Sequence, residues 1–140
     1  MQNGKTIDQL AIGDRANVSK QLTEADVLVF ATITGDKNPI HLDPAYAMQT
    51  RFKERIAHGI LTAGLISAVI GTILPGPGNI YVSQILEFKA PVGLGDTVRA
   101  EVEVIEKVPE RNRVRLRTVC SRQDGTIVID GEAVVIPRRA

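Results

Sequence analysis

The sequence predicts an α+β fold in which a curved antiparallel sheet wraps around one long, buried central helix. The first observation is a run at residues 60–74 that is apolar except for small residues and threonines. A helix that is hydrophobic on every side must be enclosed by protein, and at ~1.5 Å per residue this one is only about 22 Å long, too short for a bilayer. The second observation is that, after a break at residues 75–79, the chain alternates apolar and polar residues, which is typical of strands.

Short elements are expected ahead of the apolar run. Thr23 and Asp26 form a pattern close to a capping box, which starts a helix, and Gly35 is a natural stop for this helix. Asp43 caps a second, short helix, with Pro44 at its first position. The other expected elements are a lead-in, a short strand and the body of the second helix: residues 7–13, 14–20 and 45–50.

Four strands are expected after the break, at residues 80–89, 98–104, 113–120 and 126–136, with a hairpin-like turn at 123–125. Gln84 is the one polar residue on the apolar side of the first of them. No internal repeat or linker interrupts the pattern, so we expect one domain spanning residues 1–140.

Alternating arginines form a basic stripe on the third of these strands. We expect a solvated outer face, paired across strands with Glu101 and Glu103. Contacts with phosphate groups are the alternative. The stripe consists of Arg111, Arg113, Arg115 and Arg117.

Composition excludes several classes of protein. The 140 residues are 44% hydrophobic and 24% charged, which is typical of an ordinary globular domain. A net charge of +1 argues against a nucleic-acid binder. Cys120 is the single cysteine, so no internal disulfide and no zinc-ligand spacing is expected. The first residues lack a signal-peptide pattern, and the apolar run is too short for a membrane span, so we expect a cytoplasmic protein.

Asp36 and His41 are candidates for acid–base chemistry. They lie five positions apart across a turn that contains Asn38 and Pro39, so their side chains can converge on one small volume. A carboxylate and an imidazole that share a water molecule can hold it and move its protons. The alternative is that Asp36 closes the turn while His41 is a hydrogen-bonded structural residue.

His58 and Gly59 stand where the apolar helix begins. The N-terminus of a helix presents free N–H groups and a positive dipole end, which can hold a developing oxyanion. Glycine at this point allows a substrate carbonyl to approach closely. An acid, a base and an oxyanion donor together suit the addition or removal of water next to a carbonyl.

Residues 31–47, A-T-I-T-G-D-K-N-P-I-H-L-D-P-A-Y-A, resemble the hydratase-2 signature of the MaoC-like (R)-specific enoyl-CoA hydratases. The resemblance continues through A-H-G at 57–59, the apolar helix, and Q-I-L-E-F-K-A-P-V at 84–92, and it covers most of the chain. The length is similar to that of the single-domain, polyhydroxyalkanoate-linked type. The resemblance implies a hot-dog fold and a homodimer with the acyl chain bound near the interface.

The resemblance also implies roles for particular residues. Asp36 and His41 match the pair that holds the attacking water, and Gly59 matches the residue whose N–H binds the thioester oxygen. Asn38 is expected to support the turn and to orient the pair, and Asp43 to act as a helix cap.

Substrate contacts are also expected from four residues: Asn38, His58, Ser67 and Gln84. For His58 a structural role is the favoured interpretation. Ser67 matches a serine that the family places beside the site, and back-bonding within the helix is an equal alternative.

The predicted activity is the reversible syn hydration of trans-2-enoyl-CoA to (R)-3-hydroxyacyl-CoA, without a metal or an organic cofactor. The expected partners are an acyl-CoA substrate and a second copy of the chain, joined edge to edge through the long last strands. Nucleic acid and membranes are not expected partners. The alternatives are a dehydratase for acyl-carrier-protein or short branched substrates, and a non-catalytic acyl-CoA-binding protein of the same fold.

Overall fold

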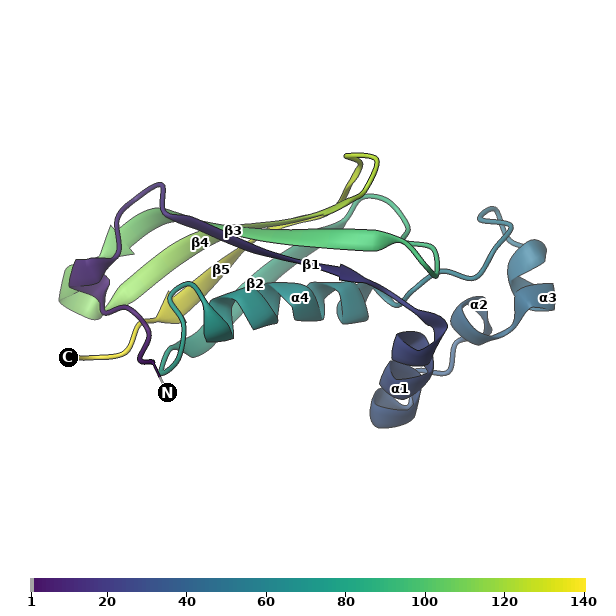
Figure 1. Cartoon of the computed structure of the whole chain (residues 1–140), viewed down its shortest axis with the longest axis horizontal. Coiled ribbons are helices and arrows are strands. Elements are labelled where there is room, and N and C mark those ends of the chain that lie inside the picture. Colours follow the sequence, from purple (N-terminus) through teal and green to yellow (C-terminus); the bar gives the residue numbers. More distant parts are fainter. Residues whose placement is uncertain (1) are drawn as a thin grey trace.

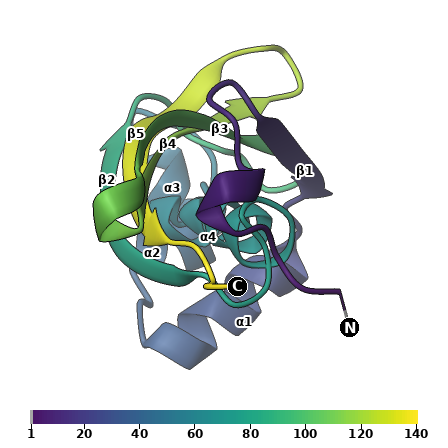
Figure 2. The ribbon, with the colours of Figure 1, turned by 90° about the vertical axis from the view of Figure 1, so that its left-hand side faces the viewer.

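The computed structural model describes residues 2–140 and contains one five-stranded antiparallel sheet (Figure 1). The strands follow the spatial order β1-β3-β4-β5-β2, so β1 and β2 form the two edges. Viewed from the end, the sheet curves around helix α4 (Figure 2). The strands are β1 (Arg15–Gln21), β2 (Ile80–Phe88), β3 (Thr97–Val108), β4 (Arg113–Arg122) and β5 (Ile127–Ile136).

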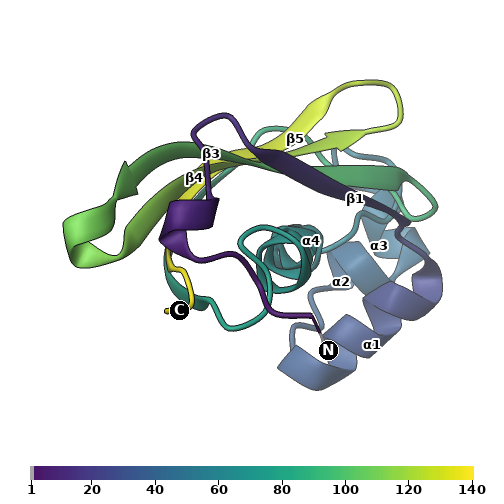
Figure 3. The ribbon, with the colours of Figure 1, turned by 60° about the vertical axis from the view of Figure 1, so that its left-hand side comes forward.

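Helix α4 (Gly59–Thr72) runs beneath the sheet, and three shorter helices gather beyond its N-terminal end (Figures 1 and 3). The two chain ends lie at the opposite end of the molecule. The predicted α+β fold and its central helix are therefore confirmed. The shorter helices are α1 (Glu24–Thr34), α2 (Pro39–Leu42) and α3 (Pro44–Met48), and two 3-10 turns are η1 (Ile7–Gln9) and η2 (Pro109–Arg111).

The predicted caps fix the helices that carry the site. The Thr23 hydroxyl accepts a hydrogen bond from the Asp26 N–H at 3.2 Å, and the Asp26 carboxylate accepts one from the Thr23 N–H at 2.9 Å. Gly35 ends α1 with a φ of 78°, a left-handed conformation that favours glycine. Asp43 caps α3 through the N–H groups of its second and third residues, as expected.

One face of α4 packs against the concave side of the sheet. Ile66, Val69 and Ile70 are buried there, together with inward-facing residues of β3 and β4. The main strand residues in this core are Val98, Ala100, Val102, Val104, Val114 and Leu116. Removal of apolar area from water, as occurs here, is the dominant favourable term in folding.

The other face of α4 is open in the single chain, although the sequence predicted a helix enclosed on every side. Ile60 is 57% exposed and Ile73 is also exposed. Strand β2 adds exposed apolar side chains along the neighbouring edge of the sheet, among them Ile80, Val82 and Ile85. The isolated chain therefore leaves apolar side chains of α4 and of β2 uncovered.

The edges of the sheet differ from the expectation that the last strands are unpaired. Strand β5 lies between β4 and β2 because β2, though earlier in the sequence, pairs with it antiparallel from Ile80 opposite Ile136 to Phe88 opposite Ile129. The edge available for pairing is therefore β2, together with β1 on the far side.

Two arginines of the stripe, Arg115 and Arg117, are ion-paired, in agreement with the solvated-face interpretation. Arg115 contacts Glu106 and Glu132, and Arg117 contacts Asp130. The expected partners Glu101 and Glu103 bind Arg15 instead, because β1 covers that edge of β3. Within residues 2–140, none of the helices has both the length and the apolar character needed to span a bilayer.

Candidate active site

Asp36, His41 and His58 come together at the N-terminal end of α4. Asp36 lies in the turn between α1 and α2, His41 lies on α2, and His58 directly precedes α4. Their ligand atoms all lie within 4.8 Å of one another. Asp36 is exposed while both histidines are buried, so the cluster has one side open to solvent and one side in the protein interior.

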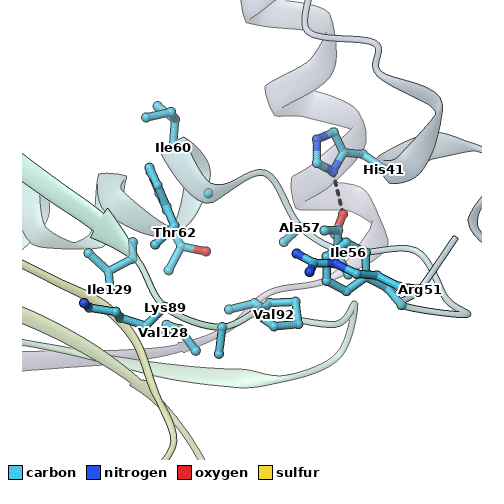
Figure 4. A pocket seen from close by; sticks show the side chains of 15 residues that line it. His41, Arg51, Ile56, Ala57, Ile60, Thr62, Lys89, Val92, Val128 and Ile129 are labelled. Carbon is cyan, nitrogen blue, oxygen red and sulfur yellow. Dashed lines mark hydrogen bonds between the residues drawn. The ribbon is translucent and has the colours of Figure 1, made fainter.

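The imidazole of His41 is held in one orientation and one tautomer. Its Nδ1 lies 2.7 Å from the carbonyl oxygen of Ile56 (Figure 4). Because a carbonyl oxygen only accepts, Nδ1 carries the proton and Nε2 keeps its lone pair. Burial lowers the pKa of His41 below its usual 6.5, despite the opposing effect of the Ile56 carbonyl. His41 therefore presents a neutral, basic Nε2 at neutral pH.

His58 supports the turn that carries Asp36. Its Nε2 donates to the carbonyl oxygen of Asp36 at 2.9 Å. Its ring packs between two others, with centroids 3.8 Å from His41 and 4.6 Å from Phe30. These contacts agree with the structural role favoured for His58, since they fix Asp36 relative to His41.

A second set of contacts fixes the segment that precedes α4. The N–H of Ala57 donates to the carbonyl oxygen of Val92 at 2.7 Å, which ties the segment to the sheet side of the molecule. The Nε of Arg55 donates to the carbonyl oxygen of His41 at 2.7 Å, and its guanidinium pairs with Glu24. The segment before α4 and the helix that carries His41 are therefore held by backbone as well as by side-chain hydrogen bonds.

Gly59 begins α4 without a side-chain cap from His58. The first N–H groups of the helix thus point out of its N-terminus, next to His41. A Cβ placed on Gly59 would lie 2.5 and 2.7 Å from two ring atoms of Phe88. Glycine is needed here because the aromatic ring of β2 packs directly onto the backbone, in addition to any need for substrate access.

A cavity of about 390 Å³ opens beside this cluster. His41 lies at one end, the first turn of α4 forms one wall, and Val92, Val128 and Ile129 form the apolar wall opposite (Figure 4). Two cationic side chains, Arg51 and Lys89, also line it. The cavity therefore combines an apolar interior with positive charge and one histidine.

Sequence reasoning missed several residues that line this cavity. They come from the segment before α4, from α4 itself and from the end of β2, and no local pattern separates them from ordinary surface or core residues. The Arg51 guanidinium stacks on the ring of Phe52, 4.8 Å from its centroid. The missed residues are Arg51, Phe52, Thr62, Phe88 and Lys89.

Two predicted substrate contacts lie away from the cavity. Ser67 is on the exposed face of α4, two turns beyond Gly59. Gln84 lies on β2, where its amide donates to Thr118 at 2.9 Å and to the carbonyl oxygen of Glu132 at 3.2 Å. Within a single chain, these two residues do not belong to the Asp36–His41 cluster.

Gln84 also accepts a hydrogen bond from the hydroxyl of Tyr81. Burial raises the pKa of Tyr81 to about 12, so this hydroxyl stays protonated. Asn38 acts within its own turn, where its side-chain oxygen accepts from the N–H of Ile40 at 3.2 Å and caps α2. Gln84 thus joins strands, and Asn38 shapes the loop between Asp36 and His41.

Asp36, His41 and His58 are also the one group of side chains in residues 2–140 whose spacing suits a metal ion. Two of the four imidazole nitrogens already donate to carbonyl oxygens, which leaves Nε2 of His41 and Nδ1 of His58. The rings of the two histidines stack at an interplanar angle of 31°, so their in-plane lone pairs are not aimed at a common point. The geometry thus suits a shared water molecule better than a coordinated cation.

Known proteins with similar sequences and structures span most of the chain. A "3-hydroxybutyryl-CoA dehydratase" of Methylorubrum extorquens is 53% identical over 133 residues, 94% of this chain and 84% of that protein. An "(R)-specific enoyl-CoA hydratase" of Rhodospirillum rubrum is 53% identical over 128 residues, 91% of this chain and 88% of that protein. The solved R-hydratase PhaJ1 of Pseudomonas aeruginosa superimposes with a TM-score of 0.92 at 48% identity, covering 98% of this chain and 88% of that one.

The model of the MaoC like domain matches residues 10–124. This segment contains the Asp36–His41 turn, the whole of α4 and four of the five strands. The match covers the greater part of the chain, and the hot-dog fold of the solved relatives agrees with the sheet and helix described above. The chain therefore belongs to the MaoC-like family.

Proposed function

We propose that this protein is an (R)-specific enoyl-CoA hydratase that interconverts trans-2-enoyl-CoA and (R)-3-hydroxyacyl-CoA. The observation that carries the proposal is the convergence of Asp36 and His41 at the N-terminus of α4, beside an apolar cavity. Relatives named for hydration and for dehydration both support it, because hydration and dehydration are two directions of one reversible reaction, and the (R) configuration is taken from the hydratase name.

The proposed reaction begins with the thioester oxygen at the N–H of Gly59. A water molecule held between Asp36 and His41 attacks C3, and Nε2 of His41 accepts one of its protons. The electrons of the C2–C3 double bond move to give an enolate, whose charge rests on the thioester oxygen and is stabilised by the helix N-terminus. A proton from the same pair then reaches C2, and the enolate collapses to the 3-hydroxyacyl thioester.

Three features of the site suit this mechanism. The neutral tautomer of His41 leaves the required lone pair free, and its lowered pKa keeps it available at neutral pH. Asp36 is open to solvent, so water reaches the pair. His58 and Asn38 hold the turn, and neither is required to touch the substrate.

A coenzyme A thioester suits the cavity. Its apolar interior accepts an acyl chain, and positive charge from Arg51 and Lys89 suits the phosphate groups of the coenzyme. No step in this mechanism needs a metal or an organic cofactor. A water-soluble coenzyme A thioester as substrate also fits the cytoplasmic location expected from the sequence.

We further propose a homodimer built on the open face of α4 and on the edge strand β2. Exposed apolar side chains along both elements support this, and a second copy would cover them symmetrically. An unpaired strand edge also invites pairing. Sedimentation equilibrium tests this part of the proposal: a dimer at micromolar concentration supports it, and a monomer refutes it.

The decisive experiment for the activity follows loss of the enoyl thioester absorbance of crotonyl-CoA. Asp36 lies in the turn before α2 and His41 lies on α2, with their side chains close together. We therefore propose that they reach the double bond from the same side, and we expect syn addition with a single enantiomer as product. Dehydrogenases selective for (R)- or (S)-3-hydroxyacyl-CoA identify it. Oxidation by the (R)-selective enzyme alone supports the proposal, whereas no turnover, an (S) product or a racemic product contradicts it.

A further inference from the structure

Thr62 carries a buried hydroxyl that the mechanism above does not use. The residue lies in the first turns of α4, and only 1% of it is exposed. Its N–H bonds the carbonyl oxygen of His58, but its Oγ1 has no hydrogen-bond partner among residues 2–140. A buried hydroxyl without a partner lowers stability, so its persistence in a site calls for an explanation.

Other helical threonines of this chain behave differently. The hydroxyls of Thr32, Thr34 and Thr72 each donate to the carbonyl oxygen four residues earlier, at 2.9, 2.8 and 2.6 Å. This back-bonding is the usual local solution for threonine in a helix. Thr62 has the carbonyl of His58 at the corresponding position, yet its hydroxyl does not bond it. The hydroxyl of Thr62 is therefore not used for back-bonding within the helix.

The hydroxyl of Thr62 points toward the cavity, but its oxygen is buried, so a ligand reaches it only when the threonine side chain or a neighbouring group moves. Thr62 lines the same space as His41 and Gly59, and Figure 4 shows its oxygen pointing into that space, on the side where Ala57 and Val92 lie. Side chains on a helix lean toward its N-terminus, so the side chain of Thr62 leans toward the first turn of α4, which begins at Gly59. A polar atom aimed into a mainly apolar cavity is a typical means of fixing a ligand.

We propose that the hydroxyl of Thr62 donates a hydrogen bond to the thioester oxygen of the substrate, as a second donor beside the N–H of Gly59. The inference rests on the proposed function, since it assigns the oxygen of an acyl thioester to this point of the cavity. A bound thioester removes the unpaired state of the buried hydroxyl. The bond strengthens as negative charge develops on the oxygen, so Thr62 contributes to turnover as well as to binding.

The test compares Thr62→Val, which keeps the shape and removes the hydroxyl, with Thr62→Ser, which keeps the hydroxyl. Calorimetry with butyryl-CoA, a saturated thioester with no double bond to hydrate, measures binding independently of catalysis. We expect Thr62→Val to weaken this binding roughly 3- to 10-fold, the range of one hydrogen bond. Turnover of crotonyl-CoA falls by about 10-fold or more, and Thr62→Ser retains most of both.

Thermal unfolding without ligand separates substrate binding from a structural role. Removal of an unpaired buried hydroxyl leaves the Tm of Thr62→Val equal or higher, whereas removal of a hydroxyl that bonds within the protein lowers it. Unchanged butyryl-CoA binding in Thr62→Val, or a lowered Tm, overturns the inference. If Thr62→Val weakens binding of 3-hydroxybutyryl-CoA but not of butyryl-CoA, the inference is also overturned, because the hydroxyl of Thr62 then contacts the substrate at C3.

The proposed function fails by a different observation, namely a wild-type protein that binds butyryl-CoA but does not hydrate crotonyl-CoA. In that case the calorimetric comparison still decides whether Thr62 contacts the thioester. A wild-type protein that binds no acyl-CoA overturns both.

Discussion

Replacing Gly59 separates two reasons for glycine at the start of α4: the close approach of Phe88 and the N–H that faces the substrate. An alanine Cβ would lie 2.5 Å from the nearest ring atom of Phe88, whereas carbon atoms settle at about 3.5 Å, so the ring or the helix start must move by about 1 Å. Displacement of this size at a reactive site costs about 10²-fold in rate. Phe88 is 54% exposed, so its ring moves without unfolding the protein.

We therefore expect Gly59→Ala to lower kcat/KM about 100-fold, and Phe88→Ala in the same chain to restore most of it. Gly59→Pro in that Phe88→Ala background then removes the N–H while keeping a Cβ. Proline is compatible with the first helical position, and His58, at ψ 133°, already has the extended geometry required before proline.

The comparison of the two double variants isolates the donor. Loss of one oxyanion donor costs roughly 2.7–4 kcal/mol, so the proline double variant should turn over crotonyl-CoA about 10²- to 10³-fold more slowly than the alanine one. Circular dichroism and sedimentation confirm that both are folded and equally associated. Equal activity of the two would refute the role of the Gly59 N–H.

Three further predictions concern the acid–base pair and the open surface. Asp36→Asn and His41→Gln should each lower kcat by about 10²–10⁴-fold with an unchanged Tm; near-normal activity in either folded variant rejects the pair. Because burial lowers the pKa of His41 below 6.5, kcat/KM should stay level as the pH falls through 6.5 and decline only below it. Between pH 6.5 and the lowered pKa of the folded protein, the imidazole is protonated in the unfolded chain but not in the folded one. The free energy of unfolding should therefore fall as the pH drops from 6.5 toward that lower pKa. A decline of kcat/KM and of the free energy of unfolding centred above pH 6.5 contradicts this. Ile85→Lys, at a side chain that is 62% exposed on β2, should convert the proposed dimer to a monomer, while Ser19→Lys on the opposite edge strand should not; a dimer in both variants, measured by sedimentation, excludes β2 as the interface.

Much of the site was predictable because its signals are local. The spacing of Asp36 and His41 across a short turn, the capping pair Thr23 and Asp26, and the cap at Asp43 are all decided by residues within a few positions of one another. The backbone conformations that glycine and proline permit determine where such turns occur. Local chemistry of this kind is readable from sequence.

Contacts between distant segments decide which residues sequence reasoning missed, and they also decide the surroundings of the predicted residue Gln84. Lys89 reaches the cavity because β2 ends beside α4, and Gln84 turns to Thr118 because β2 pairs with β5. The same pairing places β5 inside the sheet. Periodicity shows that a residue faces the apolar side of a strand, but it does not show which neighbour or space it meets there. Likewise, the apolar run at α4 gives no indication of whether this chain or a second one covers each face.

The cavity draws its parts from separate stretches of the chain. The groups proposed to move protons, and the backbone that orients them, lie within residues 36–59, whereas the wall opposite is built by Val92, Val128 and Ile129. Substitutions at these three wall residues change the shape available to an acyl chain while leaving residues 36–59 intact. Selection can therefore alter which substrates such an enzyme accepts, one side chain at a time, without passing through inactive intermediates.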